Sequence, residues 1–421
     1  MKGKMLGFIK QNTTYLLNLS STYLSQLISA ITVVVLTPIL LTRLGNQAFA
    51  QYGMVLNAVF LAGIFDFGLN IGLLKKLIAE KEDQSKLIST VFYFFLVLSI
   101  IALPIGYLAF TKYWGTNGIY GFITVILIIQ TILILFFDVM LQSVNKIYLG
   151  RTIRISKLIA EFIVLLSISS FASVEWLLLT GIILNFLYLI VLYYFAGKEV
   201  AFSLQWNLVD IRLLFDHFKY SCWYFVNAVT IVLVFNAQIM MMGWIASAEQ
   251  VARFLVLSRF FDIIRIGITN FTLILFPTLA TIQKEGNWDK LLSMFKKILL
   301  RVSLLALLVL VFAAFVVKPF FLIWSKFNDA AMGNFYLLYC VFILLIVIDN
   351  VSATFLAALK ENKVSVIISF FQGVLGISLG YFLFFKAGVL GIISASIIAL
   401  LFTNFWFNPY ILVKKLKTFN K

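Results

Sequence analysis

The sequence predicts an all-α, polytopic membrane protein with twelve transmembrane helices arranged in two lobes of six. Two observations carry this prediction. Of the 421 residues, 62% are hydrophobic and only 12% are charged, with a mean hydropathy of +1.05. A soluble domain carries about 25% charged residues, so the composition excludes a water-soluble enzyme, a nucleic-acid binder and a secreted module. The apolar residues also fall into runs of about 20, which is the length that crosses a hydrocarbon core.

Each predicted helix is one of these runs, and their unbroken apolar character excludes the alternating pattern of a membrane β-barrel. The fifth and sixth runs are separated only by residues 173–175. Joined, they would form a helix about 58 Å long, so we expect a tight hairpin there. The predicted spans are Tyr15–Leu41, Tyr52–Leu74, Leu87–Phe110, Ile119–Leu141, Leu158–Val174, Trp176–Ala196, Tyr220–Ile245, Phe254–Thr281, Ile298–Val317, Met332–Ala358, Ser365–Phe385 and Gly391–Val413.

The basic residues predict the orientation. With the N-terminus inside, the cytoplasmic segments hold 25 of the 33 Lys and Arg residues and the outer segments hold six. Because cytoplasmic loops carry an excess of Lys and Arg, both termini are predicted to be cytoplasmic. Most of the net charge of +16 then sets the topology and contacts anionic lipid. The remaining two basic residues, Arg259 and Arg265, lie inside a span.

The order of features suggests two similar halves, residues 1–197 and 198–421, each of six spans. A Lys-rich cytoplasmic loop follows the second and the eighth span, and a proline comes late in the third and the ninth, at Pro104 and Pro319. Such parallel repeats occur in membrane transporters. We therefore expect an N-terminal and a C-terminal lobe.

Polar side chains recur on one face of the first, fourth and seventh spans. Such a stripe has two interpretations, lining of an aqueous cleft or close packing of helices, because Ser and Thr also bond to their own backbone. For Asp138, near a cytoplasmic end, snorkelling to the interface is the favoured alternative. The residues predicted to line a cleft are Asn18, Thr22, Ser25, Ser29, Thr32, Thr131, Asp138, Asn227, Thr230, Gln238 and Asn270.

Charged residues inside two spans are the strongest functional candidates. Arg259, Asp262 and Arg265 step by three along the eighth span, and an Arg at the centre of a membrane helix costs about 2.5 to 3.5 kcal/mol on insertion scales. One acid cannot neutralise two bases, so we favour an anion site over a structural ion pair. Asp66, in the second span, is predicted to bind a proton or cation or to pair with an arginine.

Other chemistry has little support in the sequence. The two cysteines, Cys222 and Cys340, have no metal-type spacing, and no nucleotide-binding P-loop motif is present. The lone histidine, His217, lies in a basic amphipathic stretch, residues 208–219, that predicts an interfacial helix leading into the seventh span. We therefore expect no catalytic residue, no metal and no cofactor.

The chain resembles the Wzx-type polysaccharide-unit flippases, in the superfamily (MOP) that also contains multidrug and toxin extruders (MATE) and lipid II flippases. The resemblance covers the two six-span halves, the segments 42–45 and 52–53 after the first span, 66–68 in the second and 142–146 after the fourth. Lipid II flippases have an Arg followed three residues later by an acid in the eighth span, and Arg259 with Asp262 matches that pair. Those relatives have fourteen spans, so twelve favour the oligosaccharide branch.

The resemblance implies a flippase that moves an undecaprenyl-diphosphate-linked oligosaccharide, an O-antigen or capsule repeat unit, to the periplasmic leaflet of a bacterial inner membrane by alternating access. Arg259, Arg265 and Arg43 would receive the diphosphate, and Asp66 or Asp262 would couple an ion. Membrane lipids, a polysaccharide polymerase and a chain-length regulator are the expected partners of a monomer. The alternatives are a cation-coupled drug or metabolite antiporter of the same fold and a membrane-embedded O-antigen polymerase or ligase, which would need a large periplasmic loop.

Overall fold

The computed structural model describes residues 13–79, 84–114, 118–168, 173–200, 202–273, 279, 282–283, 285–359 and 361–419. The chain divides into two compact units, Met1–Val229 and Thr230–Lys421, and each is described by itself. The described residues are almost entirely helical, and none is in a strand. The predicted all-α fold is confirmed. The predicted lobe boundary at residue 197 refers to membrane spans and stays a prediction.

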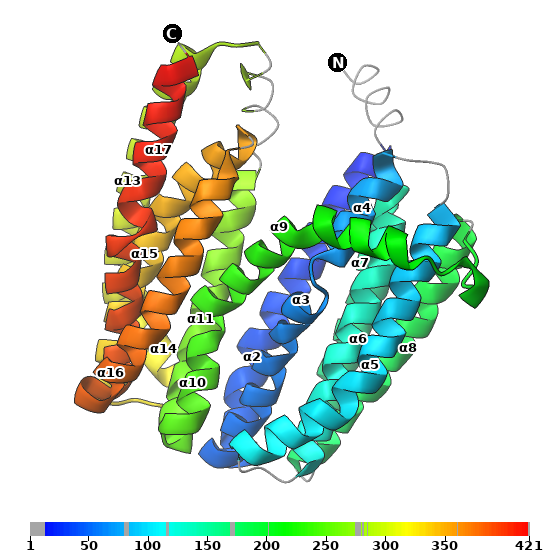
Figure 1. Ribbon diagram of the computed structural model, residues 1–421. Helices are drawn as coiled ribbons and strands as arrows, with labels where there is room; N and C mark the ends of the chain where they lie inside the picture. Colours follow the sequence, from blue (N-terminus) through cyan, green and yellow to red (C-terminus); the bar gives the residue numbers. More distant parts are fainter. Residues whose placement is uncertain are drawn as a thin grey trace, which may run out of the picture. The chain divides into compact units, whose positions relative to one another are not determined.

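The first unit is a bundle of long helices (Figure 1). Its first helix bends at Gly45, whose φ of +75° is a backbone conformation that glycine adopts without steric cost. This bend falls between the predicted first and second spans. The helices are α2 Thr13–Ala58, η1 Val59–Leu61, α3 Ala62–Phe65, α4 Leu69–Ala79, α5 Gln84–Trp114, α6 Gly118–Ser143, α7 Ile147–Ile168, α8 Val174–Glu199, η2 Trp206–Leu208 and the first part of α9 Ile211–Phe235.

The core of the first unit lies between α4, α5, α6 and α8. Leu69, Ile88, Phe136, Met140 and Leu192 are fully buried there. Aromatic rings interlock edge to face at its centre, with centroids 6.1 Å apart for Phe95 and Phe136. Lipid tails are as apolar as these side chains, so close packing rather than exclusion from water holds such helices together.

The second unit is a separate helical bundle. Its helix α16 bends at Gly388, where φ is +57°, between the predicted eleventh and twelfth spans. The residues with fully buried side chains include Leu356 and Leu412. The helices are the end of α9, α10 Ala237–Ile245, α11 Ala248–Leu273, α13 Trp288–Phe312, the π-helical turn η3 Ala313–Val317, α14 Lys318–Ser325, α15 Ala330–Ala358, α16 Asn362–Phe402 and α17 Asn404–Phe419.

Among the described residues, eight helical runs are long and apolar enough to cross a membrane. Two of them, Leu16–Phe65 and Lys363–Thr418, each contain two predicted spans. The predicted fifth and eighth spans are α7 and α11, which are helical but more polar. The fifth and sixth spans are separate helices, as expected, and the total agrees with the predicted twelve.

Several helices begin well before the predicted spans. Helix α13 begins at Trp288 rather than Ile298, and α9 at Ile211 rather than Tyr220, where residues 208–219 were predicted as an interfacial helix. Helix α7 begins at Ile147 rather than Leu158, and α11 at Ala248 rather than Phe254. The added turns contain charged residues, including Arg151 and Glu249, that pair with neighbours. The predicted starts are late because an apolar run marks only the part of a helix that faces lipid.

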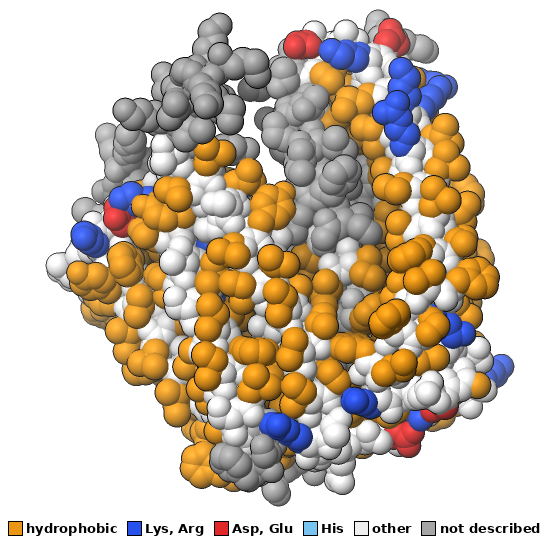
Figure 2. Space-filling model, turned by 180° about the vertical axis from the view of Figure 1, so that it is seen from behind, with side chains coloured by type: hydrophobic (Ala, Val, Ile, Leu, Met, Phe, Trp, Pro, Cys, Tyr) orange, Lys and Arg blue, Asp and Glu red, His pale blue; other side chains and the backbone are white. Residues whose placement is uncertain are grey.

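The surface is that of a multi-pass membrane protein. Large apolar side chains such as Leu308, Phe315 and Phe320 are 68%, 79% and 74% exposed. Figure 2 shows hydrophobic side chains along the middle of the helices and charged ones mainly toward their ends. An apolar surface this extensive needs lipid around it, because soluble monomers rarely expose contiguous patches above a few hundred Å².

Candidate functional site

The predicted seventh span is a broken helix, and the break organises the site in the second unit. Helix α9 ends at Phe235 and α10 begins at Ala237, with Asn236 between them at φ −116° and ψ −31°. Asn236 stays in the right-handed α region, and its N–H bonds Val232 O at 2.9 Å, so the break is one irregular turn in a helical span. Here the break places Phe235 against α11 and Gln238 against α16.

Arg265 is held by two partners at this break. Its Nε and Nη2 lie 2.9 and 2.8 Å from Asp262 Oδ1. Its guanidinium carbon lies 4.2 Å from the centroid of the Phe235 ring, within the range of a cation–π contact. The side chains of Arg265 and Asp262 are 24% and 45% exposed, so the pair is partly open to a ligand.

The sequence does not show which arginine pairs with Asp262, because Arg259 and Arg265 are both three residues away from Asp262. In the structure Asp262 pairs with Arg265. Arg259 is partly buried and lies six residues before Arg265, about 120° away around α11. The three side chains have a formal charge of +1. The side chain of Asn270 lies outside the described residues.

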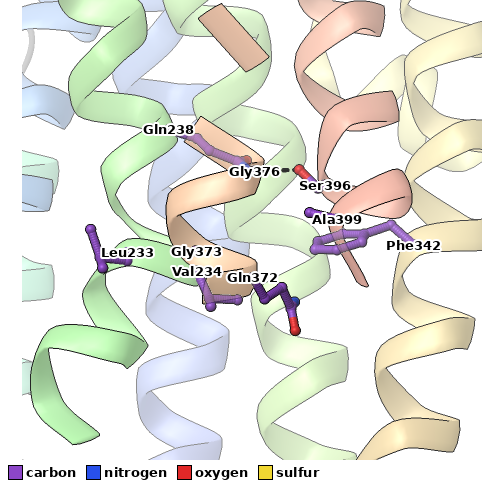
Figure 3. Close-up of a pocket in the computed structure, with 9 residues that line it drawn as sticks. All are labelled: Leu233, Val234, Gln238, Phe342, Gln372, Gly373, Gly376, Ser396 and Ala399. Carbon is purple, nitrogen blue, oxygen red and sulfur yellow. Dashed lines mark hydrogen bonds between the residues drawn. The ribbon is translucent and has the colours of Figure 1, made fainter. Parts of the chain in front are cut away.

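A small polar pocket lies on the other side of the break (Figure 3). Gln238 Nε2 donates to Ser396 Oγ at 2.6 Å. The pocket volume of about 10 Å³ is enough for one water. Gly373 lets α16 approach α9 closely, because a Cβ at this position would lie 2.5 Å from Leu233 Cβ. The lining residues are Leu233, Val234, Gln238, Phe342, Gln372, Gly373, Gly376, Ser396 and Ala399.

Buried amides continue this polar layer away from the pocket. Asn404 Nδ2 donates to Gln372 Oε1 at 2.8 Å and to Ser369 Oγ at 2.6 Å. One turn further along α17, Asn408 Nδ2 donates to Asp349 Oδ1 at 2.8 Å. Gln372, Asn404 and Asn408 were not predicted from the sequence, although two Asn residues at i, i+4 in an apolar span were a usable signal.

Asp66, in the first unit, forms a turn rather than an ion pair among the described residues. It is 5% exposed, and its Oδ1 accepts from Gly68 N–H at 2.6 Å. Phe67 and Gly68 have φ of +53° and +71°, so the helix stops at Phe65 and restarts at Leu69. An Asp side chain that bonds the backbone two residues on is a common turn device.

Asp138 is buried beneath the start of α7. Its Oδ2 accepts from Gln142 Nε2 at 2.9 Å and lies 3.5 Å from Arg151 Nη1. A Cβ on Gly150 would lie 2.3 Å from its Oδ1, so the glycine makes room for the carboxylate. These contacts give Asp138 a local structural role.

The polar stripe of the first span divides into two kinds of contact. Asn18 is 7% exposed and bonds to the turn between α6 and α7, with its Nδ2 3.0 Å from Asn145 O. The Thr22 hydroxyl donates to Asn18 O of its own helix at 2.7 Å. Ser25 is 2% exposed and its Oγ has no hydrogen-bond partner among the described residues, whereas Ser29 and Thr32 are partly exposed.

The other predicted residues are distributed over both units. Thr131 bonds its own helix at Leu127 O, 2.8 Å away, and Arg43 donates from an exposed position to Leu166 O at 2.9 Å. Asn227 is partly exposed and Thr230 is buried. Of the predicted set, the structure groups Arg265, Asp262 and Gln238 around the break in the second unit.

Residues 9–283 match the family described as polysaccharide biosynthesis protein. No match to a curated protein was found. Among solved structures, the lipid II flippase MurJ in an inward closed conformation has a TM-score of 0.75 at 13% identity, covering 96% of this chain and 90% of that chain. An inward-facing multidrug resistance MATE family transporter of the MOP superfamily has a TM-score of 0.64 at 13% identity, covering 96% and 99%. A MOP superfamily transporter from Pyrococcus furiosus has a TM-score of 0.62 at 12% identity, covering 97% and 95%.

Proposed function

The chain belongs to the polysaccharide biosynthesis protein family, and we propose that it is the flippase that moves an undecaprenyl-diphosphate-linked oligosaccharide, an O-antigen or capsule repeat unit, across a bacterial inner membrane. Family and fold are those of membrane flippases and transporters, not of enzymes. The direction that we propose is from the cytoplasmic to the periplasmic leaflet, by alternating access. Both termini would then be cytoplasmic.

The observation that carries this proposal is the cluster of Arg265, Asp262 and Phe235 at the broken helix. A diphosphate brings about two negative charges and matches the planar fork of a guanidinium. It would compete with Asp262 for Arg265, and Arg259 would supply a second positive charge. Arg43 stays a third candidate for binding the diphosphate. The partly exposed Arg265 supports the proposal because a ligand has access to it.

The polar layer beside this cluster supports a sugar-bearing substrate. Gln238, Gln372 and Ser396 carry amide and hydroxyl groups and no charge. In this structure they are buried, with Gln238 bonded to Ser396 and Gln372 to Asn404, and in the proposed cycle they become open to sugar hydroxyls when the lobes rock. An organic-cation antiporter would instead need acids without partners, and here Asp66 caps a turn while Asp262 holds Arg265. Asp66 and Asp262 remain our candidates for ion coupling. A polymerase and a chain-length regulator are the partners that this pathway implies.

Lipid analysis of cells that lack the protein tests the proposal. We expect lipid-linked repeat units to accumulate on the cytoplasmic leaflet, and the wild-type protein to restore export. Arg265→Ala should lower export roughly tenfold or more, the scale of a lost charged hydrogen bond, while Arg265→Lys keeps the charge and part of the export. The exposed Arg301 in α13 provides the matched control, since Arg301→Ala should export normally.

One result would reject the flippase function, and another would reject the anion site. Cells without the protein that show no accumulation would exclude the flippase function. Wild-type export by Arg265→Ala, with the protein present at normal levels, would exclude the anion site while leaving the flippase function open.

A further inference from the structure

The first half of α9, which joins the two units, has one face docked on the first unit. His217 is fully buried, and its Nε2 donates to Leu69 O at 3.1 Å. Phe218 contacts Phe67 and Phe94, with ring centroids 5.9 and 5.1 Å apart. These two docked side chains point about 100° apart around α9, and several other side chains of this part of the helix are exposed.

The exposed face beside the docked side chains is apolar along one edge and basic along the next. Ile211 and Phe215 are 65% and 64% exposed, and Cys222 is also exposed. At about 100° per residue these three lie within about 40° of arc. Lys219 and Arg212, both exposed, follow about 40 to 60° further round. We call these five residues the α9 surface.

The charges around the α9 surface are mostly positive. On α4, Lys75 and Lys76 lie over the rings of Tyr224 and Tyr220, with Nζ 4.7 and 5.8 Å from the centroids. Asp216 is the exposed acid on this part of α9, and Asp210 before the helix is paired with Lys86 at 2.8 Å. The α9 surface itself carries Arg212 and Lys219 with Asp216 as the neighbouring exposed acid, and Lys75 and Lys76 lie on another side of the helix, at Tyr224 and Tyr220.

Helix α9 also has the direction of a helix at a membrane surface. In Figure 1 its first half crosses the helices α5 and α6 of its own unit instead of running along them. It lies next to α4, whose Lys75 and Lys76 contact its tyrosine rings. Just before it, Trp206 is 64% exposed and packs edge to face on Tyr93 at 5.0 Å, and Trp is typical of the membrane interface.

We propose that the α9 surface binds anionic phospholipid of the cytoplasmic leaflet. Ile211 and Phe215 lie among the acyl chains, and Arg212 and Lys219 contact the headgroup phosphates. An apolar stripe beside a basic stripe is the pattern of helices that lie in the interface, and anionic lipid adds electrostatic attraction to the burial of the apolar side chains. Because α9 continues into the second unit, the bound lipid contacts the segment that connects the two units.

The experiment is a binding titration with the purified full chain in neutral detergent. Phosphatidylglycerol and phosphatidylcholine are added in parallel, and bound lipid is counted by native mass spectrometry. The test variant is Arg212→Gln with Lys219→Gln. The control variant, Lys296→Gln with Lys297→Gln, removes an equal charge from an exposed pair on α13. Circular dichroism before lipid addition checks that each variant is folded.

We expect wild-type protein to bind phosphatidylglycerol in preference to phosphatidylcholine. The α9 variant should lose roughly tenfold or more in affinity, as removal of two basic residues near an anionic headgroup implies, and the control should stay within about threefold of wild type. Equal binding of the two lipids by wild type would overturn the proposal, as would an equal loss in both variants. Phe215→Ser should weaken both lipids alike, because it removes the apolar anchor and no charge.

Discussion

At the scale of single residues, Asn18 shows how a polar group inside a span is used. Its Nδ2 lies 3.0 Å from Asn145 O, and its Oδ1 accepts from Tyr148 N–H at 2.8 Å. Asn145 has φ of +61°, so the turn that it forms between α6 and α7 exposes backbone groups with no helical partner. Asn18 satisfies them from a third helix, α2.

Asn18→Ala should therefore destabilise the protein. It removes two part-buried hydrogen bonds, to the Asn145 carbonyl and from the Tyr148 N–H, each worth about 0.5 to 1.5 kcal/mol, and we expect a lower melting temperature in detergent. Thr22→Val is the matched control on the same face, because Thr22 bonds only its own helix, and its melting temperature should change little. Equal effects of the two substitutions would contradict this role for Asn18.

The side chain of Asp329 provides a second prediction at this scale. Its Oδ1 accepts from Met332 N–H at 2.8 Å at the start of α15, and its Oδ2 is 2.6 Å from Arg253 Nη1. Desolvation raises its pKa, but the hydrogen bond from Met332 and the charge of Arg253 outweigh that effect and lower the pKa below the usual 3.8. A lowered pKa stabilises the folded state above about pH 4, and this contribution is lost as the pH falls through the folded-state pKa.

Thermal unfolding between pH 3 and pH 6 tests the contribution of Asp329. Wild type should lose stability on the acid side of this window, and Asp329→Asn should lose less there because it has no carboxylate to protonate. Glu249→Gln also removes a partner of Arg253 but leaves Asp329 in place, so it should keep the acid loss. An Asp329→Asn profile parallel to wild type would show that another group is responsible.

At the scale of elements, two glycines decide how α4 crosses α9. A Cβ on Gly68 would lie 2.5 Å from Phe225 N, and a Cβ on Gly72 would lie 2.1 Å from Ser221 Oγ. The spacing of Gly68 and Gly72 is the small-xxx-small pattern, which lets two helix backbones approach closely. The crossing fixes the helix that leads from the first unit to the second.

Gly72→Ala should destabilise this crossing by about 1 to 3 kcal/mol, as overpacking does. Ser221→Ala in the same protein removes the clashing Oγ and should restore part of the stability, since the Ser221 Cβ lies 3.3 Å from the added Cβ. Gly63→Ala is the control, because nothing lies within 4 Å of its Cβ. Melting temperatures of the four proteins form a double-mutant cycle, and additive effects would rule out the contact.

At the scale of the whole molecule, the fold and the distribution of basic residues both indicate a multi-pass membrane protein. The similarity to MOP superfamily structures and the family match confirm the expected fold. The distribution of 25 of the 33 basic residues over alternate loops predicts the orientation of that fold in the membrane.

Reporter fusions measure the orientation. Green fluorescent protein fused after Lys421 should fluoresce, because that end is predicted to be cytoplasmic. Alkaline phosphatase fused after Lys326, in a predicted outer loop, should be active, and a fusion after Lys363, in a predicted inner loop, should be inactive. The opposite pattern at Lys326 and Lys363 would reverse the topology and with it the proposed direction of transport.

The sequence by itself determined the membrane class, the helical fold and the approximate spans. These depend on hydropathy, which is a local property of 20-residue runs, and on the charges of the loops between them. The same property located Arg259, Asp262 and Arg265 inside a span. It placed the starts of α7 and α11 too late, because each helix begins with polar turns that precede its apolar run.

Only the tertiary structure decided which polar groups meet. Asn18 and Asn145 are 127 residues apart, and Gln372 meets Asn404 from a different helix, so no local pattern relates them. Asp262 has an arginine three residues away on each side in the sequence. In the structure it pairs with Arg265, whose guanidinium also contacts the ring of Phe235 at the end of α9. A polar side chain in a span has the same hydropathy whether it caps a turn, pairs with a charge or faces a pocket, and its neighbours across the fold make the difference.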